Sequence, residues 1–453
     1  MTVSCHLVEC AGKRILIDCG MYQGGRELIE ENSEPFGFDP GSIDFLLLTH
    51  SHLDHCGRIP LLSKRGFQGE LVTTAASVEL ARLVMLDSAG LQEEEARYQQ
   101  RKARRRHGDH HRRIEPLYTT LDVLNSLDHF GRQARYEEPV QLAPGIRATF
   151  FDAGHILGSA SILLELEERG RHHRLLFSGD LGYGGRVILR DPARPPAVDT
   201  VVMETTYGDR LHKQLEPSIA ELYLVLNDTL ERGGNVIIPT FALERAQEIL
   251  YYLREGVEGG QIEHFINVFL DSPMAISATE IFERHPECFD RETLKVSKDG
   301  EDPFDLPGLH FTRDTADSIA INQINSGAVI LAGSGMCTGG RVRHHLKHAL
   351  WRENCSVVFV GYAARGTLAR RIIDGASQVR IFGEEIPVRA SVHTISGFSA
   401  HADQAQLLAW HAKTGNPART FLVHGEADVM RGFAERLKNT EVVMPTLHQS
   451  FEL

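Results

Sequence analysis

The chain carries four side chains that can bind a metal ion within six residues, directly after an apolar run. The run covers residues 43–48, and His50, His52, Asp54 and His55 follow it. An apolar run of this length predicts a buried strand, which would deliver the four side chains at one edge of a sheet. Imidazole and carboxylate ligands without thiolate suit catalytic Zn²⁺ or a similar ion. A polar turn that happens to be rich in histidine is the alternative interpretation. As a metal site, the spacing favours two ions over one, with Asp54 and His55 turned toward the second.

The composition is that of an ordinary globular protein. The chain has 453 residues, of which 42% are hydrophobic and 24% are charged. This length allows two or three domains, or one domain with a large insertion. No apolar run reaches the length of a membrane span, and the N-terminus lacks the pattern of a secretory signal. The seven cysteines form no Cys-x-x-Cys pair, which indicates reduced thiols. We therefore expect a cytoplasmic protein that enters no membrane.

The charge of the whole chain contrasts with that of one short segment. A net charge of -13 argues against a protein that coats nucleic acid non-specifically. One basic run, from Arg101 to His107 and continuing to Arg112 and Arg113, could still contact phosphate groups. A solvated helix end is an equally good interpretation of this run.

In the first half of the chain, apolar segments repeatedly end in a metal-binding or acidic side chain. Four segments end in Asp18, His50, Asp180 and Glu204, and a turn between two further segments carries His155. The pattern predicts strands over residues 14–18, 43–49, 146–152, 160–167, 175–180 and 200–204, and helices over 75–102 and 119–131.

After residue 207 the pattern changes to short strands that are apolar on both faces, each followed by a helical segment. These strands cover residues 235–239, 265–270, 328–332 and 356–360. Such alternation predicts a parallel sheet in an α/β domain of its own. Near residues 387–391 the chain returns to the first pattern, and its strands again end in histidine. We therefore expect one domain inserted in another, with boundaries at 1–207, 208–388 and 389–453.

The strand-end ligands suit a pair of metal ions. The first ion would be held by three histidines, which are His50, His52 and His155. The second would be held by Asp54, His55 and His424, with Asp180 as the bridge between the two ions. Two cations about 3.5–4 Å apart lower the pKa of a shared water and can hold both the attacking and the leaving oxygen of a displacement. We expect two Zn²⁺ per chain, with Mn²⁺ as the alternative. Asp18 would orient a ligand histidine rather than bind metal.

These residues give the chain a resemblance to a known family. The pattern His-x-His-x-Asp-His at 50–55, with a later His, a later Asp and the earlier Asp18, resembles the metallo-β-lactamase signature. Residues 204–208, 398–403 and 423–426 resemble the three extra motifs of the β-CASP subfamily, and residues 239–246, 333–340 and 361–367 agree with its inserted domain. The resemblance covers almost the whole chain and points to bacterial relatives of the endonuclease subunit of the eukaryotic cleavage and polyadenylation specificity factor.

The resemblance implies a four-layer αββα sandwich with an inserted α/β β-CASP domain on a mainly parallel sheet, and an active site at their interface. It also implies a zinc-dependent ribonuclease, an endonuclease that in some members is also a 5′→3′ exonuclease. A metal-bridged hydroxide would cut the phosphodiester and leave a 5′-phosphate and a 3′-hydroxyl. His401, oriented by Glu204, would act as general acid on the leaving oxygen, and Asp54 could accept a proton from the attacking water. In the family, a histidine in the third extra motif, here His424, accompanies RNA substrates.

The resemblance has departures and leaves alternatives. Family members usually open with one more strand before the segment that matches residues 3–8, and neither an added RNA-binding domain nor a dimerisation domain is expected here. A small-molecule metallo-β-lactamase-type hydrolase would lack the insert, and a catalytically silent RNA-processing scaffold would have lost ligands. Single-stranded RNA is the expected partner, because a closed cleft between two domains admits a thin chain more readily than a duplex. A homodimer and a monomer both remain open.

Two residues of the expected inserted domain are candidates for substrate contacts. Ser334 lies in a glycine-rich turn before a helix, where a phosphate could bind, and Arg365 could contact the RNA backbone. A plain turn is an equally good interpretation of the first segment. Three histidines, His344, His345 and His348, have helical spacing without another ligand type nearby, which favours an exposed helix face over a metal site.

Overall fold

The computed structural model describes residues 3–22, 30–107, 114–263, 265–361, 363–364 and 366–453. The chain divides into two compact units. Unit 1 comprises Met1–Gly184, Asp191–Leu211 and His401–Leu453, and unit 2 comprises Gly185–Arg190 and His212–Ala400. In sequence, unit 2 is therefore inserted within unit 1.

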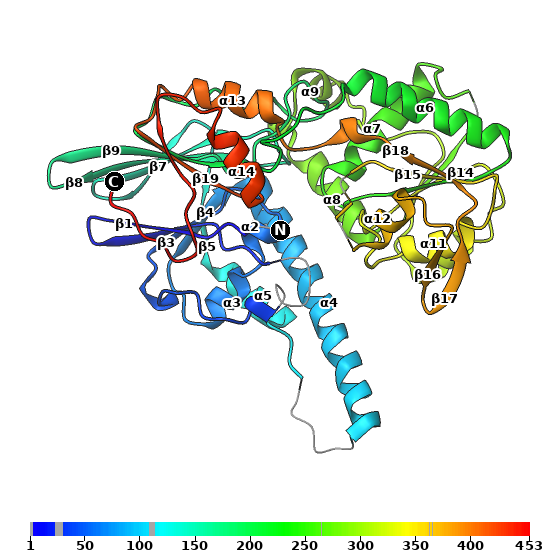
Figure 1. Cartoon of the computed structure of the whole chain (residues 1–453), viewed down its shortest axis with the longest axis horizontal. Helices are drawn as coiled ribbons and strands as arrows, with labels where there is room; N and C mark the ends of the chain where they lie inside the picture. The colour runs from blue at the N-terminus through cyan, green and yellow to red at the C-terminus, as the bar shows by residue number, and fades with distance from the viewer. Residues whose placement is uncertain (1–2, 23–29, 108–113, 264, 362, 365) are drawn as a thin grey trace. The chain divides into compact units, whose positions relative to one another are not determined.

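Two β-sheets form the centre of unit 1 (Figure 1). The five-stranded sheet has the order β1 (His6–Cys10), β2 (Lys13–Ile17), β3 (Phe45–Leu47), β4 (Glu70–Thr74) and β5 (Phe130–Ala134). The seven-stranded sheet has the order β20 (Glu441–Val443), β19 (Arg419–Val423), β10 (Thr200–Glu204), β9 (Arg171–Phe177), β8 (Ala160–Glu168), β7 (Ile146–Asp152) and β6 (Pro139–Ala143). Aliphatic and aromatic side chains of both sheets pack between them, among them Ile15, Val72, Phe150, Ile162 and Phe177.

Helices cover the outer faces of the two sheets. The helices on the side of the five-stranded sheet are α3 (Ile59–Lys64), α4 (Ala75–His107) and α5 (Thr120–Ser126) (Figure 1). On the seven-stranded sheet, Trp410 of α13 (Gln404–Ala412) and Phe433 of α14 (Ala427–Ala434) pack in one cluster with Val201 and Leu422. This is the expected αββα arrangement, which is confirmed. Among the helices that the structure describes, none is long and apolar enough to cross a membrane.

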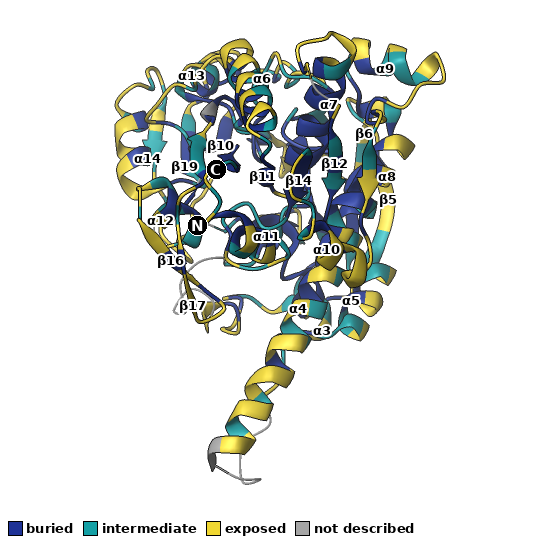
Figure 2. Cartoon of the chain, turned by 90° about the vertical axis from the view of Figure 1, so that its right-hand side faces the viewer, coloured by how far each residue is buried: buried dark blue, intermediate teal, exposed yellow. Residues whose placement is uncertain are grey.

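Unit 2 is built on a six-stranded sheet. Its order is β13 (Leu309–Phe311), β12 (Asn267–Leu270), β14 (Ala328–Ala332), β11 (Val236–Pro239), β15 (Ser356–Phe359) and β18 (Ser391–Thr394), and every pairing in it is parallel. The described helices of this unit are α6 (Leu215–Glu231), α7 (Arg245–Glu258), α8 (Pro273–Arg284), α9 (Arg291–Lys298), α10 (Thr315–Ile321), α11 (Val342–Ala349) and α12 (Leu368–Ile373). A separate hairpin joins β16 (Gln378–Ile381) and β17 (Glu384–Pro387). The inner strands β11 and β14 are buried on both faces (Figure 2), as expected for a parallel sheet.

The end of unit 2 lies later in the sequence than the residue pattern suggested. The pattern placed the return to the first domain at residue 389, whereas β18 pairs in parallel with β15 and the unit runs to Ala400. β18 has the sequence Ser-Val-His-Thr and is only partly buried. It is an edge strand of its sheet, so it lacks the uniformly apolar pattern by which the inner strands were recognised.

Candidate metal centre

The ends of several strands of unit 1 meet at one edge. β9, β10 and β19 are parallel, and β7 runs in the same direction because β7 and β9 are both antiparallel to β8. Their carboxyl ends carry His155, Asp180, Glu204 and His424, and His50 follows β3 of the other sheet. The strand order thus brings residues from far apart in the sequence to one place within unit 1.

Two glycines allow the loops that carry these residues to approach closely. A Cβ atom added to Gly20 would lie 1.7 Å from the backbone oxygen of Asp54, and one added to Gly182 would lie 1.7 Å from that of Gly154. Backbone hydrogen bonds join the same loops, from Cys19 to His55 and from Gly182 to Ala153. A side chain at either glycine would therefore push two ligand-bearing loops apart.

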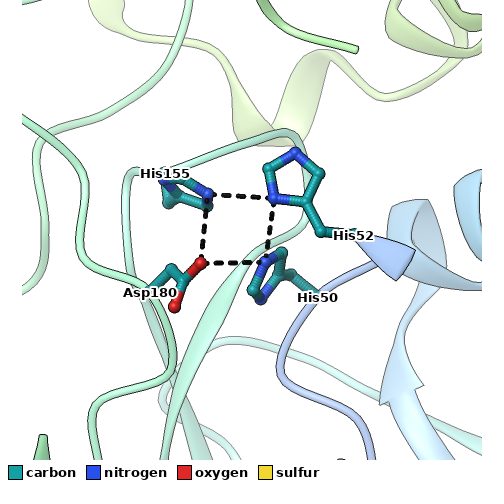
Figure 3. A group of neighbouring side chains, drawn as sticks. All are labelled: His50, His52, His155 and Asp180. Carbon is teal, nitrogen blue, oxygen red and sulfur yellow. Dashed lines mark hydrogen bonds and ion pairs between the residues drawn. The ribbon is translucent and has the colours of Figure 1, made fainter. Parts of the chain in front are cut away.

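Three histidines and one aspartate form the first ligand group (Figure 3). Nδ1 of His52 lies 3.1 Å from Nε2 of His50 and 3.2 Å from Nε2 of His155. Oδ2 of Asp180 lies 3.5 Å from the same nitrogen of His50 and 3.6 Å from that of His155. One ligand atom of each residue lies within 4.8 Å of the others, so the four atoms converge as the ligands of a single cation would.

Asp54, His55 and His424 form the second ligand group, again with ligand atoms within 4.8 Å of one another. Nε2 of His424 lies 3.4 Å from Oδ2 of Asp54. The other oxygen of Asp180, Oδ1, lies 3.3 Å from Nε2 of His55 and 3.4 Å from Nδ1 of His424. Asp180 therefore presents one oxygen to each group, which is the geometry of a carboxylate that bridges two cations.

The polar atoms around Asp180 fit a bound cation. Among the buried side-chain atoms of the described residues that have no hydrogen-bond partner, three lie here, namely Nε2 of His55, Oδ1 of Asp180 and Nε2 of His424. Leaving a buried polar atom unpaired costs about 1–3 kcal/mol, which is large against a total stability of about 5–15 kcal/mol. A cation among these atoms would satisfy all three. The donors are nitrogen and oxygen throughout, which suits Zn²⁺ or Mn²⁺.

The electrostatics of the first group also suit metal binding. Burial lowers the pKa of His50 well below its usual value and that of His52 to about 4, so both imidazoles are neutral and offer lone pairs at neutral pH. Burial by itself would raise the pKa of Asp180, but the charges of His424 and His55 outweigh it and hold this pKa well below the usual range. Asp180 is therefore an ionised carboxylate at neutral pH.

Asp18 lies behind the second group and contacts a histidine rather than the centre of the cluster. Its Oδ2 atom lies 2.7 Å from Nδ1 of His55, so that Nε2 of the same ring faces Asp180. Thr49 donates its backbone N–H to Oδ1 and its hydroxyl to Oδ2 of Asp18, both at 2.8 Å. A carboxylate held in this way fixes the tautomer and orientation of the imidazole, which is the role expected for Asp18.

Glu204 and His401 form a pair beside the first group. Nδ1 of His401 lies 3.2 Å from both carboxylate oxygens of Glu204. The same carboxylate accepts backbone N–H groups of Leu181 at 2.5 Å and of Thr206 at 3.3 Å, which fixes its position. Nε2 of His401 lies 4.0 Å from Oδ2 of Asp180. Burial disfavours the charged imidazole, but the charge and hydrogen bond of Glu204 raise the pKa of His401 to about 9. His401 therefore holds a proton at neutral pH.

Two threonines near the ligands were not singled out by the sequence. The Thr49 hydroxyl lies 3.1 Å from Nδ1 of His50 as well as contacting Asp18. The Thr206 hydroxyl lies 3.2 Å from Nδ1 of His424 and donates to the backbone oxygen of that residue at 3.1 Å. The signals in the sequence that could have identified them are their positions at strand ends next to candidate ligands and, for Thr206, its place in the motif at residues 204–208.

The two candidate substrate contacts, Ser334 and Arg365, are not tested by the structure. Ser334 lies in unit 2, in the loop between β14 and α11, with its hydroxyl 3.4 Å from that of Thr338 and from the backbone N–H of Gly339. Its role stays a prediction. Arg365 lies outside the described residues.

Comparison with protein families matches nearly the whole chain. The fold and the strand-end ligands define a metal-dependent hydrolase. The model of the metallo-beta-lactamase superfamily matches residues 1–240, that of the Beta-Casp domain matches 246–372, and that of the Zn-dependent metallo-hydrolase RNA specificity domain matches 385–445. The chain belongs to the metallo-β-lactamase superfamily and, within it, to the β-CASP nucleases, as the sequence motifs predicted.

Individual relatives agree with this assignment. The chain is 40% identical over 437 residues to Ribonuclease TTHA0252 of Thermus thermophilus, which covers 96% of this chain and 93% of that protein. It is 31% identical to Transcription termination factor FttA of Methanocaldococcus jannaschii, over 96% of this chain and 67% of that protein. The FttA protein of Pyrococcus horikoshii is 34% identical to this chain, and the match covers 85% of this chain and 58% of the Pyrococcus protein.

A solved structure shares the fold at low sequence identity. A protein of unknown function from Enterococcus faecalis V583 superposes with a TM-score of 0.55 and 11% identity, covering 99% of this chain and 96% of that one. At this identity the likeness concerns the fold alone.

Proposed function

We propose that this protein is a ribonuclease that binds two Zn²⁺ per chain and hydrolyses phosphodiester bonds of single-stranded RNA. The observation that carries the proposal is the position of Asp180, with Oδ2 toward His50 and His155 and Oδ1 toward His55 and His424. A shared carboxylate between two groups of nitrogen and oxygen donors supports a pair of cations rather than one. We infer Zn²⁺ as the native metal, with Mn²⁺ as the alternative.

RNA is the substrate that the relatives favour. One relative is named a ribonuclease and others are named transcription termination factors, and residues 385–445 match a domain model described as conferring RNA specificity. A small-molecule hydrolase would need neither this segment nor the β-CASP insert. A catalytically silent scaffold is disfavoured because each expected ligand is present and lies in one of the two groups.

We assign a separate role in hydrolysis to each group of residues. His50, His52 and His155 would hold one cation, and Asp54, His55 and His424 the other. When bound, the cations would supply an activated water and neutralise charge on the phosphate oxygens. We assign to Asp18 and Thr49 the orientation of His55, through the hydrogen bonds described above.

His401 is the general acid in this proposal. Its Nδ1 atom is held by Glu204 and its Nε2 atom is directed toward the ligand groups, so a proton on Nε2 can pass to the leaving 3′-oxygen. Asp54, a buried carboxylate beside His424, can accept the proton released by the attacking water. Hydrolysis then leaves a 5′-phosphate and a 3′-hydroxyl.

The proposal includes both endonucleolytic cleavage and 5′→3′ exonucleolytic removal of nucleotides. We also infer that the protein acts in the cytoplasm, since all seven cysteines are free thiols and free thiols are typical of reducing compartments. The oligomeric state, monomer or homodimer, stays open to measurement by light scattering.

Cleavage of end-labelled nucleic acids tests the proposal. Zinc-loaded protein is incubated with single-stranded RNA, duplex RNA and single-stranded DNA of one sequence, with and without a chelator. We expect cleavage of single-stranded RNA that the chelator abolishes and added Zn²⁺ restores. Internal fragments from 5′-labelled RNA would indicate endonuclease action, and mononucleotides would indicate exonuclease action. Equal cleavage with and without chelator, or no cleavage of RNA by zinc-loaded protein, would contradict the proposal.

A further inference from the structure

The C-terminal half of α4 carries a row of cations that the proposed hydrolysis does not use. Arg101, Lys102 and Arg105 are separated by one, three and four residues, so they share one face of the helix. Tyr98 precedes Arg101 by one turn and belongs to the same face, with 54% of its surface exposed. In both views this half of the helix projects away from the sheets of unit 1 and is largely exposed (Figures 1 and 2).

The opposite face of the same helix is covered by the returning chain. Ala96 is buried. The Glu93 carboxylate accepts the backbone N–H of Thr120 at 2.8 Å, and the Gln100 side chain accepts that of Ile114 at 2.8 Å. These contacts fix the rotation of α4, so the arginine-bearing face is held open to solvent.

The three cations on the open face, Arg101, Lys102 and Arg105, differ from Arg97 in their ion pairing. Arg97 forms an ion pair with Glu93 at 2.9 Å, whereas in the part of the chain that the structure describes Arg101, Lys102 and Arg105 form no ion pair. Cations at a helix C-terminus are stabilised by the helix dipole, but this effect falls off within the last turn. Arg101 lies before the last turn of α4, so the dipole does not account for it.

We propose that this face of α4 is a capture site for the backbone of single-stranded RNA. Arg101, Lys102 and Arg105 would contact phosphates, and Tyr98 would stack on a base. Cations combined with an exposed aromatic ring are how proteins bind single strands without reading their sequence. The chain has a net charge of -13, which by itself would repel the RNA backbone. A local cationic face would therefore assist the binding of RNA. The proposal deepens the ribonuclease function and rests on it for the identity of the ligand.

The helix also sets the length of RNA that can reach both sites. Its N-terminal end lies against the loop that carries His155, because the hydroxyls of Thr74 and Ser77 donate to the backbone oxygen of Gly158 at 2.7 and 2.9 Å. From Ala75 to Arg105 the helix rises by about 45 Å at about 1.5 Å per residue. At about 3.4 Å per stacked nucleotide this distance corresponds to about 13 nucleotides. A strand of roughly six nucleotides is too short to bridge it, and one of roughly 30 is long enough.

The test uses a triple variant, R101Q/K102Q/R105Q, in which glutamine preserves the helix propensity. The matched control is R135Q/R171Q/R436Q, which removes three exposed arginines elsewhere in unit 1. Affinity for RNA of six and of 30 nucleotides is measured in the presence of chelator, at several salt concentrations. The native protein and the control should bind the longer RNA more tightly. We expect the triple variant to lose roughly tenfold in affinity for the longer RNA, and its salt slope to fall by about 2, since each phosphate contact on a single strand contributes about 0.7.

Two further variants separate charge and stacking from a loss of helix structure. R101K/R105K keeps the charges and should bind nearly as the native protein does, whereas Tyr98→Ala should weaken binding roughly fivefold or more. The proposal is wrong if the glutamine variant binds the longer RNA as the control does, or if the lysine variant is as weak as the glutamine variant. Poly-glutamate serves as a second probe. If it bound as tightly as the longer RNA and lost this binding in the glutamine variant, the proposal would be overturned and an acidic protein partner indicated.

The capture site and the ribonuclease proposal fail in distinguishable ways. Arginine-dependent binding of RNA without any metal-dependent cleavage would support the capture site and contradict the ribonuclease. Metal-dependent cleavage by a glutamine variant that binds the longer RNA as the control does would support the ribonuclease and overturn the capture site.

Discussion

Each unit contains a buried cluster of carboxylate and imidazole, and the two clusters differ in how their polar atoms are paired. In unit 2, Oδ2 of Asp271 lies 2.6 Å from Nε2 of His345 and accepts the Ser318 hydroxyl at 2.6 Å. Oδ1 of Asp271 accepts a hydrogen bond from Arg341 at 2.7 Å, and Nδ1 of His345 lies 3.0 Å from the Asn322 side chain. Every polar atom of this carboxylate and this imidazole has a protein partner.

The cluster of unit 1 contains the same residue types, but several of its polar atoms have no hydrogen-bond partner. Around Asp180, Nε2 of His55, Oδ1 of Asp180 itself and Nε2 of His424 are buried without a hydrogen-bond partner. Since a buried polar group is normally paired, the unit 2 cluster has the properties of a structural network and the unit 1 cluster those of a ligand site. The comparison shows that burial of His and Asp is not itself a sign of metal binding; unpaired ligand atoms that converge within 4.8 Å of one another are.

Removal of Asp180 should produce the largest effect, because both ligand groups share its carboxylate. We expect Asp180→Ala to lose metal from both groups and to lower RNA cleavage by more than about 10⁴-fold, since each cation supplies several kcal/mol. Metal content and cleavage rate measured on the same sample check this. Asp271→Ala is the matched control and should keep its metal. If the two variants retained equal metal, the distinction between the clusters would be wrong.

Glu204→Gln should separate metal binding from proton transfer. Glu204 contacts His401 and backbone N–H groups, so the variant should keep its metal content. The kcat for RNA should fall by about 10²–10⁴-fold, the usual contribution of a general acid. Elemental analysis and steady-state kinetics measure both quantities. A loss of metal in proportion to the loss of activity would show that Glu204 is a ligand rather than an orienting residue.

Asp271→Asn should lower stability without touching the metal centre. Loss of one partner of a buried charged pair costs about 3–5 kcal/mol. Burial alone would raise the pKa of Asp271, but hydrogen bonds from His345, Ser318 and Arg341 hold it below its usual value. Its contribution is therefore complete above the ordinary carboxyl pKa and is lost as the pH falls through the lower folded value. Urea unfolding at neutral and acidic pH should show an acid-dependent loss in the native protein that is smaller in the variant. An identical pH dependence would contradict this.

Asp18→Asn should have a smaller effect, since Asp18 acts through His55. Loss of a carboxylate that orients a ligand histidine typically costs about 10–100-fold in metal affinity or activity. Zinc titration of the variant with a competing chelator measures the change, which should fall mainly on the second ligand group. A loss of all metal would instead indicate that Asp18 is itself a ligand.

The sequence could predict features that depend on local pattern. Apolar runs that end in Asp or His correctly indicated the strand ends of unit 1. Each strand and the polar residue at its end lie in one short segment, so no partner far along the chain is needed to recognise them. The motif at 50–55 indicated the family, and with it the two layers of sheet. The inner strands of unit 2 were predicted for the same reason, since burial on both faces leaves a continuous apolar run.

Features that depend on partners far along the chain could not be predicted from pattern. His345 was expected on an exposed helix face, yet it is buried, because Asp271, 74 residues away, supplies its partner. The edge strand β18 was assigned to the first domain, since its sequence lacks the uniformly apolar pattern of the inner strands. Thr49 and Thr206 contribute hydroxyls to the metal centre only through contacts that the folded sheets create.

The number of metal ions bound at Asp180 tests the central claim most directly. Protein reconstituted with excess zinc and then freed of unbound metal is analysed by elemental analysis, and its crystals are measured at the zinc absorption edge. We expect two zinc ions per chain, one beside His50, His52 and His155 and one beside Asp54, His55 and His424, with an oxygen of Asp180 toward each. A single ion, or none, at this position in zinc-saturated protein would contradict the account.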